Sequence, residues 1–190
     1  MREGKIERKT KETTIDVKIN LDGSGEAEVQ TGIRFFNHLL ESFAKHGRFD
    51  LEAKAQGDFE HHIAEDTMIA LGAALEDALG DKVGIRRMGD AIVPMDDSLA
   101  LVAIDLGGRV YSEIEVDFTK KQLDDLSSDL LVHLLETFAS NGKFNLHVKI
   151  MRGDNDHHKA EAIFKALGVA LSEAVSLTGS REIPSTKGAI

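Results

Sequence analysis

The first regular pattern along the chain is an alternation of apolar and polar residues between positions 13 and 21. Four apolar residues occupy every second position there: Ile15, Val17, Ile19 and Leu21. A period of two predicts a strand with one buried face. Asp-Gly-Ser-Gly follows at 22–25, and residues 26–31 are expected to return as a second strand, so we predict a hairpin.

A similar arrangement recurs later in the chain. Strands expected over 99–106 and 110–118 flank Gly107-Gly108, a two-residue hairpin signal. After each hairpin the pattern predicts a helix, a short strand and a longer helix. The expected helices are 33–46, 60–79, 128–141 and 157–175, and the expected short strands are 49–55 and 144–150. The longer helices carry apolar residues at helical spacing, namely Ile63, Leu71, Leu75 and Leu79 in one and Leu167 and Leu171 in the other. Gly47 and Gly142 are predicted to be left-handed C-terminal caps.

The two halves are a sequence duplication. Residues 38–51 and 133–146 are identical at 9 of 14 positions, and residues 57–76 and 153–172 are identical at 11 of 20. The offset changes from 95 to 96 between these blocks, so one connection absorbs an extra residue. The chain is therefore predicted to be an α+β protein built from a tandem β-β-α-β-α unit. We expect repeat halves at 1–92 and 93–182, and an irregular tail at 183–190 that contributes to the site of one compact domain.

Composition narrows the range of functions. The formal net charge of −10 and the lack of a basic cluster argue against nucleic-acid binding. No apolar run approaches 18 residues, so no membrane span is expected. The chain has no cysteine, which excludes disulfides and thiolate metal ligands and fits a cytoplasmic protein.

Repeated polar residues point to metal chemistry. Both halves contain His-His-x-x-Glu on an expected helix, at His61-His62-x-x-Glu65 and at His157-His158-x-x-Glu161. Adjacent helical residues diverge by about 100°, whereas residues four apart share a face. The first His of each motif is therefore expected to bind one metal with its Glu, while the second His points at another metal.

Pseudo-symmetry then completes two ligand shells, with an upstream His repeated at positions 38 and 133. One shell would contain His61, Glu65, His158 and His133, and the other would contain His157, Glu161, His62 and His38. Three imidazoles and one carboxylate suit a first-row divalent ion with open coordination positions. Spacing does not decide whether each shell closes within one chain or across a subunit boundary.

Simpler interpretations exist for these residues. A single His-His pair on a helix is more often a solvated face than a ligand pair, and only its duplication favours metal. Glu41 and Glu136 are interpreted as helix-surface carboxylates, and His46 and His147 break the repeat.

The same residues resemble the imidazoleglycerol-phosphate dehydratase family over nearly the whole chain. The resemblance rests on residues 8–13, Phe36-Asn37-His38-Leu39-Leu40, both His-His-x-x-Glu motifs, residues 84–89, Pro94-Met95-Asp96-Asp97, His133 and Ser185-Thr186-Lys187-Gly188. It implies two four-stranded sheets with helices packed between them. It also implies two Mn²⁺ ions per active site and a 24-subunit shell built from trimers, with active sites at subunit boundaries. The expected form is the monofunctional one, without the phosphatase domain that some members carry.

The resemblance further implies a lyase of histidine biosynthesis that converts imidazole glycerol phosphate to imidazole acetol phosphate. Two metals on the ring nitrogens would favour an imidazolate that expels the neighbouring hydroxyl. Glu65 and Glu161 would cancel only two of the four positive charges of the two metal ions, so net positive charge would remain where the imidazolate develops. Glu12 is the expected acid or base and contacts substrate. Arg87, Arg109, Ser185 and Lys187 are the expected phosphate contacts, with Arg86 as the alternative to Arg87.

Two other functions are compatible with parts of this pattern. A non-catalytic metal-storage or structural shell would explain the ligands but not the basic residues Arg87, Arg109 and Lys187. An RNA-binding α+β module is disfavoured by the negative charge.

Overall fold

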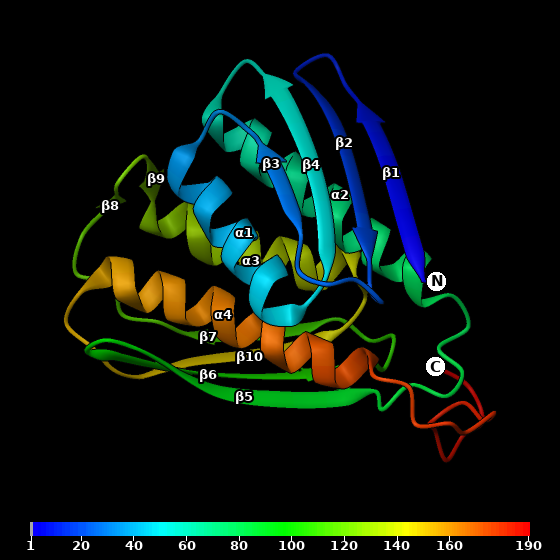
Figure 1. The fold of residues 1–190 in the computed structure, drawn as a ribbon. Helices are drawn as coiled ribbons and strands as arrows, with labels where there is room; N and C mark the ends of the chain where they lie inside the picture. Colours follow the sequence, from blue (N-terminus) through cyan, green and yellow to red (C-terminus); the bar gives the residue numbers. More distant parts are fainter. Residues whose placement is uncertain (1) are drawn as a thin grey trace.

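The computed structural model of the protein describes residues 2–190, and two four-stranded sheets enclose its helices (Figure 1). The elements of the first half are β1 (Glu3–Lys9), β2 (Thr13–Asn20), β3 (Ala27–Gln30), α1 (Arg34–Gly47), β4 (Asp50–Gly57) and α2 (Glu60–Leu79). Those of the second half are β5 (Met88–Met95), β6 (Ser98–Asp105), β7 (Tyr111–Glu115), β8 (Gln122–Leu123), β9 (Leu126–Ser127), α3 (Ser128–Asn141), β10 (Asn145–Arg152) and α4 (Asp156–Val175). The predicted α+β duplication is confirmed.

Each half begins with a strand that the apolar pattern missed. The inward positions of β1 are Gly4, Ile6 and Arg8, so only one of them is a large apolar residue. Gly4 is needed because a Cβ there would overlap the backbone of Ala74 in α2, and Gly89 of β5 meets Ala170 of α4 in the same way. Small residues at the helix contact hide these strands from a hydrophobicity pattern.

The two predicted hairpins are wrong, because their strands are not neighbours. The sheets have the orders β1-β2-β4-β3 and β5-β6-β10-β7, so β4 and β10 lie between the expected partners. β3 pairs with β4 in parallel, and β7 pairs with β10 in parallel. The antiparallel neighbours in sequence are instead β1 with β2 and β5 with β6.

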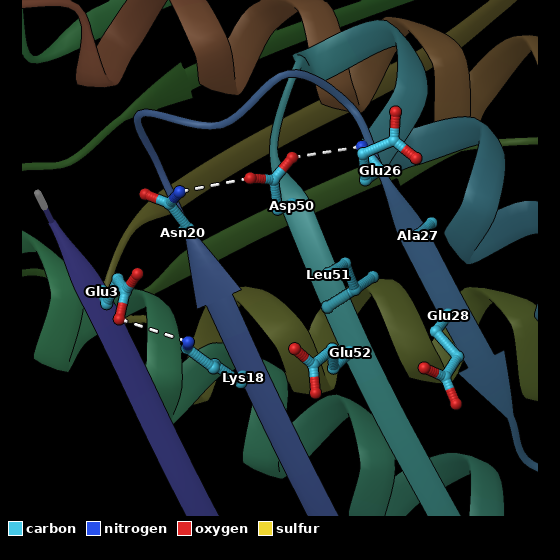
Figure 2. A pocket seen from close by; sticks show the side chains of 9 residues that line it. All are labelled: Glu3, Lys18, Asn20, Glu26, Ala27, Glu28, Asp50, Leu51 and Glu52. Carbon is cyan, nitrogen blue, oxygen red and sulfur yellow. Dashed lines mark hydrogen bonds and ion pairs between the residues drawn. The ribbon is translucent and has the colours of Figure 1, made fainter.

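Asp50, the first residue of β4, explains the first exception. Its carboxylate accepts hydrogen bonds from the Asn20 side chain and from the backbone N–H of Glu26 (Figure 2). It also accepts one from the backbone N–H of Ser24. These bonds lower the pKa of Asp50, the bond from the Ser24 N–H most of all. The turn is therefore held against β4, and β3 continues on its far side. In the second half, Asn145 begins β10 and donates to the Arg109 carbonyl.

Helices from the two halves pack together between the sheets. α2 covers β1 and β2, α4 covers β5 and β6, and the closest helix pairs are α1 with α4 and α2 with α3. Gly72 and Gly168, which correspond in the repeat, let these pairs approach closely. A Cβ on Gly72 would lie 2.8 Å from the Phe138 carbonyl oxygen, and one on Gly168 would overlap that of Phe43. The core is thus shared by both halves.

The predicted left-handed caps at Gly47 and Gly142 are also wrong. The left-handed residues are the next ones, Arg48 at φ 60° and Lys143 at φ 53°. The glycines serve a steric purpose, because a Cβ at either would collide with the ring of the phenylalanine two residues later, Phe49 or Phe144. Both rings are fully buried.

Within residues 2–190, no helix combines the length and apolar character needed to cross a membrane.

Candidate metal centres

One group of ligand-type side chains joins α2 to α3, and we call it the α2–α3 cluster. It consists of His61, Glu65 and His133. The Nε2 atom of His133 lies 3.0 Å from Oε1 of Glu65, and the Nε2 atom of His61 lies 3.5 Å from Oε2. The two imidazoles stack with centroids 5.9 Å apart. Two ring nitrogens and a carboxylate therefore converge on one point.

A second group, the α1–α4 cluster, has the same composition. It consists of His38, His157 and Glu161. Oε2 of Glu161 lies 3.4 Å from Nε2 of His38 and 3.7 Å from Nε2 of His157. In both clusters the nitrogens facing the carboxylate are Nε2, and all ligand atoms of a cluster lie within 4.8 Å of one another.

Helix geometry and packing produce these clusters together. The first His and the Glu of each motif are four residues apart, so they share one helix face. The third ligand comes from a helix of the other half: His133 on α3 meets α2, and His38 on α1 meets α4. The structure thus brings three of the four residues of each predicted shell together within one chain.

His62 and His158 lie outside both clusters. Nδ1 of His62 is 2.8 Å from Oδ1 of Asp58 and 3.8 Å from Oε2 of Glu12, and the Asp58 hydrogen bond raises the pKa of His62. Nδ1 of His158 is 2.6 Å from Oδ1 of Asp97. A bond from the backbone N–H of Asn155, supported by the one from His158, holds the pKa of Asp97 well below its usual range. The carboxylates occupy the Nδ1 atoms only. Nε2 of His158 lies 3.6 Å from Oδ2 of the exposed Asp96 and 3.5 Å from the Asn155 side-chain amide.

Lys165 distinguishes the α1–α4 cluster electrostatically. Its Nζ atom lies 2.7 Å from Oε1 of Glu161, opposite the oxygen that faces the histidines. Burial opposes ionisation of Glu161, but hydrogen bonds from Lys165 and His38 keep its pKa below the ordinary value. Burial and the charge of Lys165 lower the pKa of nearby His46. His147, by contrast, packs against Tyr111 on the outer face of β10.

The predicted phosphate contacts gather at the other end of the molecule. Arg87 pairs with Asp105 through two bonds, Nε–Oδ1 at 2.7 Å and Nη2–Oδ2 at 3.0 Å, and donates from Nη1 to the Pro184 carbonyl at 2.9 Å. The bond to Asp105 raises the pKa of Arg87 further. Pro184 precedes Ser185 and Lys187, so the irregular tail lies beside Arg87. Gly108, next to Arg109, lies against the tail residue Ile190.

These basic residues are far from the α1–α4 cluster of the same chain. The Arg87 backbone N–H bonds to the Ala174 carbonyl near the end of α4, whereas His157 lies in the first turn of that helix. Seventeen residues of α-helix separate His157 from Ala174, a rise of about 25 Å. One chain therefore does not bring its metal-ligand residues and its basic residues to the same point.

A hollow on the outer face of the first sheet does not suit an anionic ligand. Five carboxylates line it, with Lys18 as its single basic residue (Figure 2): Glu3, Glu26, Glu28, Asp50 and Glu52. Lys18 is itself paired with Glu3 at 3.3 Å. The negative field would repel a phosphate ester.

Sequence reasoning missed the aspartates that hold the histidines. Asp97 lies in the Pro94-Met95-Asp96-Asp97 motif, but no contact was predicted for it. Asp58 lies four residues before His62, a spacing that indicates a contact at the start of the helix. Asp124, whose Oδ2 lies 2.7 Å from Nδ1 of His157, has no signal in the repeat. Each of these three aspartates thus accepts a hydrogen bond from Nδ1 of one predicted ligand: His62, His158 or His157. Imidazoles that bind metal through one nitrogen commonly donate the other to a carboxylate, so the donor set and its supports suit divalent ions.

The chain is similar to known proteins over its whole length. Residues 31–171 match the sequence model of the imidazoleglycerol-phosphate dehydratase family. The imidazoleglycerol-phosphate dehydratase of Dehalococcoides mccartyi is 54% identical, with 98% of this chain and 96% of that protein covered. The enzyme of the same name from Methanosarcina mazei is 53% identical, and both chains are covered completely.

Solved structures are similar over almost the same span. The IGPD of Pyrococcus furiosus, solved in complex with (S)-C348, superposes with a TM-score of 0.84 at 36% identity, covering 97% of this chain and 100% of that one. The imidazoleglycerol-phosphate dehydratase of Staphylococcus aureus gives a TM-score of 0.84 at 31% identity, covering 92% and 99%.

Proposed function

The chain belongs to the imidazoleglycerol-phosphate dehydratase family, and we propose that it dehydrates imidazole glycerol phosphate to imidazole acetol phosphate in the cytoplasm, using two Mn²⁺ ions per active site. Membership makes it a dehydratase of histidine biosynthesis, and the cytoplasmic placement rests on that biosynthetic role. The observation that carries the metal part of the proposal is the pair of matching His-Glu-His clusters. Membership sets aside the metal-storage shell and the RNA-binding module.

In this proposal each cluster holds one ion. His61, Glu65 and His133 bind the first, and His157, Glu161 and His38 bind the second. When bound, the two ions supply Lewis-acid charge that favours the imidazolate form of the substrate ring. First-row ions other than manganese also suit this donor set.

His62 and His158 would complete the shells of a neighbouring copy. Two facts support this: both lie apart from the clusters of their own chain, and both have Nδ1 hydrogen-bonded to a carboxylate, so that Nε2 is the nitrogen left to bind a metal. An imidazole held in this way is oriented and made more basic before a metal arrives. Each ion would then connect two copies of the chain.

The phosphate would be bound by the basic end of another copy. Arg109 and Lys187 are exposed there, and Ser185 adds a hydroxyl. Arg87 uses three of its five N–H groups within the chain, which leaves two for a phosphate oxygen. Because the α1–α4 cluster and this end are about 25 Å apart along α4, a substrate that touches both must lie between copies.

Glu12 would hold or accept the proton that moves in the reaction. Its carboxylate is exposed and lies 3.8 Å from Nδ1 of His62, which places it beside a proposed ligand of the neighbouring metal. The substrate carbon has no adjacent carbonyl to acidify it, so a positioned acid or base is needed as well as charge.

The proposed assembly is a 24-subunit shell made from trimers. Its support here is that each metal cluster lacks its fourth predicted ligand within one chain, and that the phosphate contacts lie far from the α1–α4 cluster of the same chain. Closed assemblies of identical chains place the same two surfaces together at every boundary, so every site would be completed in the same way.

Mixing two inactive variants tests whether sites are shared. E12A removes the proposed acid or base beside His62, and R109A removes a phosphate contact at the other end of the molecule. Neither residue is a proposed metal ligand, so both variants should still assemble. If each site uses these residues from different copies, chains that are dissociated, mixed and reassembled with Mn²⁺ should recover activity at about a quarter of the sites. The variants assembled separately are the matched controls. No recovery from mixed particles, verified by mass spectrometry of differently tagged chains, would contradict sharing.

A further inference from the structure

The short β8–β9 hairpin has no counterpart in the first half. Between β3 and α1 only residues 31–33 intervene, whereas residues 116–127 connect β7 to α3. The hairpin pairs Gln122 with Ser127 and Leu123 with Leu126, and two aspartates form its tip. Asp124 takes a left-handed conformation at φ 53°, which turns both carboxylates toward neighbouring helices.

Asp125 fixes the helix that carries His38. Its carboxylate accepts the backbone N–H groups of Arg34 at 2.7 Å and Phe35 at 2.8 Å. The N-cap residue of α1, Ile33, has no side-chain cap of its own. A carboxylate at this position satisfies free N–H groups and interacts favourably with the helix dipole.

Asp124 fixes the orientation of His157. A carboxylate accepts hydrogen bonds, so Nδ1 of His157 is the donor to Asp124 Oδ2. In a neutral imidazole held this way, the lone pair that can bind a metal is on Nε2. That Nε2 atom faces Glu161 Oε2 at 3.7 Å. The tip of one hairpin thereby acts on two of the three ligands in the α1–α4 cluster.

The α2–α3 cluster lacks this support. Among the residues 2–190, no carboxylate lies against Nδ1 of His61, the repeat counterpart of His157; its ion-pair partner is Glu65, through Nε2. We infer that Asp124 is a positioning residue that presets the α1–α4 cluster for its divalent ion, a support that the α2–α3 cluster lacks. The inference rests on the proposed function, which assigns one ion to each cluster.

Titration of the full chain with Mn²⁺ alone tests the inference. After chelation, the electron paramagnetic resonance signal of free Mn²⁺ reports how much is bound at each addition. Wild type should bind two ions per chain. D124A should weaken one of the two sites by about 10- to 100-fold, the usual effect of removing a carboxylate behind a ligand, and leave the other unchanged. D124N should lose less, because its amide oxygen still accepts the Nδ1–H bond.

A double variant separates positioning from general loss of charge. In an H157A background, D124A should have no further effect on Mn²⁺ binding, since its target is gone. An equal loss in both backgrounds would overturn the inference, as would D124A sites that match wild type. Failure of wild type to bind any Mn²⁺ would instead overturn the proposed function, and the inference with it. Thermal unfolding of the metal-free variants shows whether the fold is retained.

Discussion

The α2–α3 and α1–α4 clusters contain the same three residue types but different surroundings. Glu65 keeps about a third of its side chain exposed and has Ile69 four residues later, whereas Glu161 is 9% exposed and has Lys165 at that position. His157 is held by Asp124, and His61 pairs only with its own cluster. Duplication therefore preserved the ligands while the supports diverged. The repeated residues are the predicted metal ligands. The unrepeated residues, Asp124 and Lys165, give the two clusters different hydrogen bonds and charge.

The largest effect is expected from variants that test whether turnover requires both clusters. H61A and H157A should each reduce turnover to less than a tenth of wild type, because one ion on the substrate ring cannot replace two. Turnover of Mn²⁺-loaded protein measures this, with H147A, whose ring packs on Tyr111 away from both clusters, as the control. If either ligand variant kept more than a tenth of the activity, the two-metal scheme would fail.

Removal of metal should next disrupt assembly. If ions connect copies, the chelated protein should run as a smaller species, a trimer, and return to the large particle with Mn²⁺. Light scattering follows the change. H38A should impair both metal uptake and assembly, while R109A should weaken substrate binding and leave the particle intact. An unchanged mass after verified metal removal would contradict bridging by the ions.

Acidification should release the metal more gradually than a chelator does. Ligating imidazoles must be neutral, so Mn²⁺ content should fall as the pH drops below about 6.5. In the metal-free protein, NMR titration should place His62 above its ordinary pKa and His46 below it. The raised pKa of His62 stabilises the metal-free fold below the unfolded value of about 6.5, and this contribution disappears as the pH rises through the folded value. Constant metal content from pH 8 to pH 5 would show that histidines are not the ligands.

The smallest effect concerns the support of α1. D125A should lower the free energy of unfolding of the metal-free protein by about 1 kcal/mol, because two N–H groups lose their cap. D125N, which still accepts these bonds, should lose less. Chemical denaturation measures both. The first turn of α3 is capped by Ser127, so S127A should cost a similar amount if the two caps are equivalent.

Much of the fold could be predicted because it depends on local patterns. The four helices lie within a residue of the expected bounds, since apolar spacing and helix ends are short-range properties. β1 and β5 could not be found this way, because Gly4 and Gly89 suit a close helix rather than an apolar stripe. The hairpins failed for a different reason: a turn sequence does not show that a later strand such as β4 will lie between the two it joins.

The sequence by itself determined the ligand types and their grouping on each helix, because a spacing of four residues places two side chains on one face whatever surrounds the helix. Only the tertiary structure decided that α2 meets α3 and α1 meets α4, which closes three ligands around each point within one chain. It also decided that His62, His158 and the basic end lie elsewhere, and that Asp124 reaches His157 across 33 residues. These relations depend on how distant elements pack, and no local spacing encodes them.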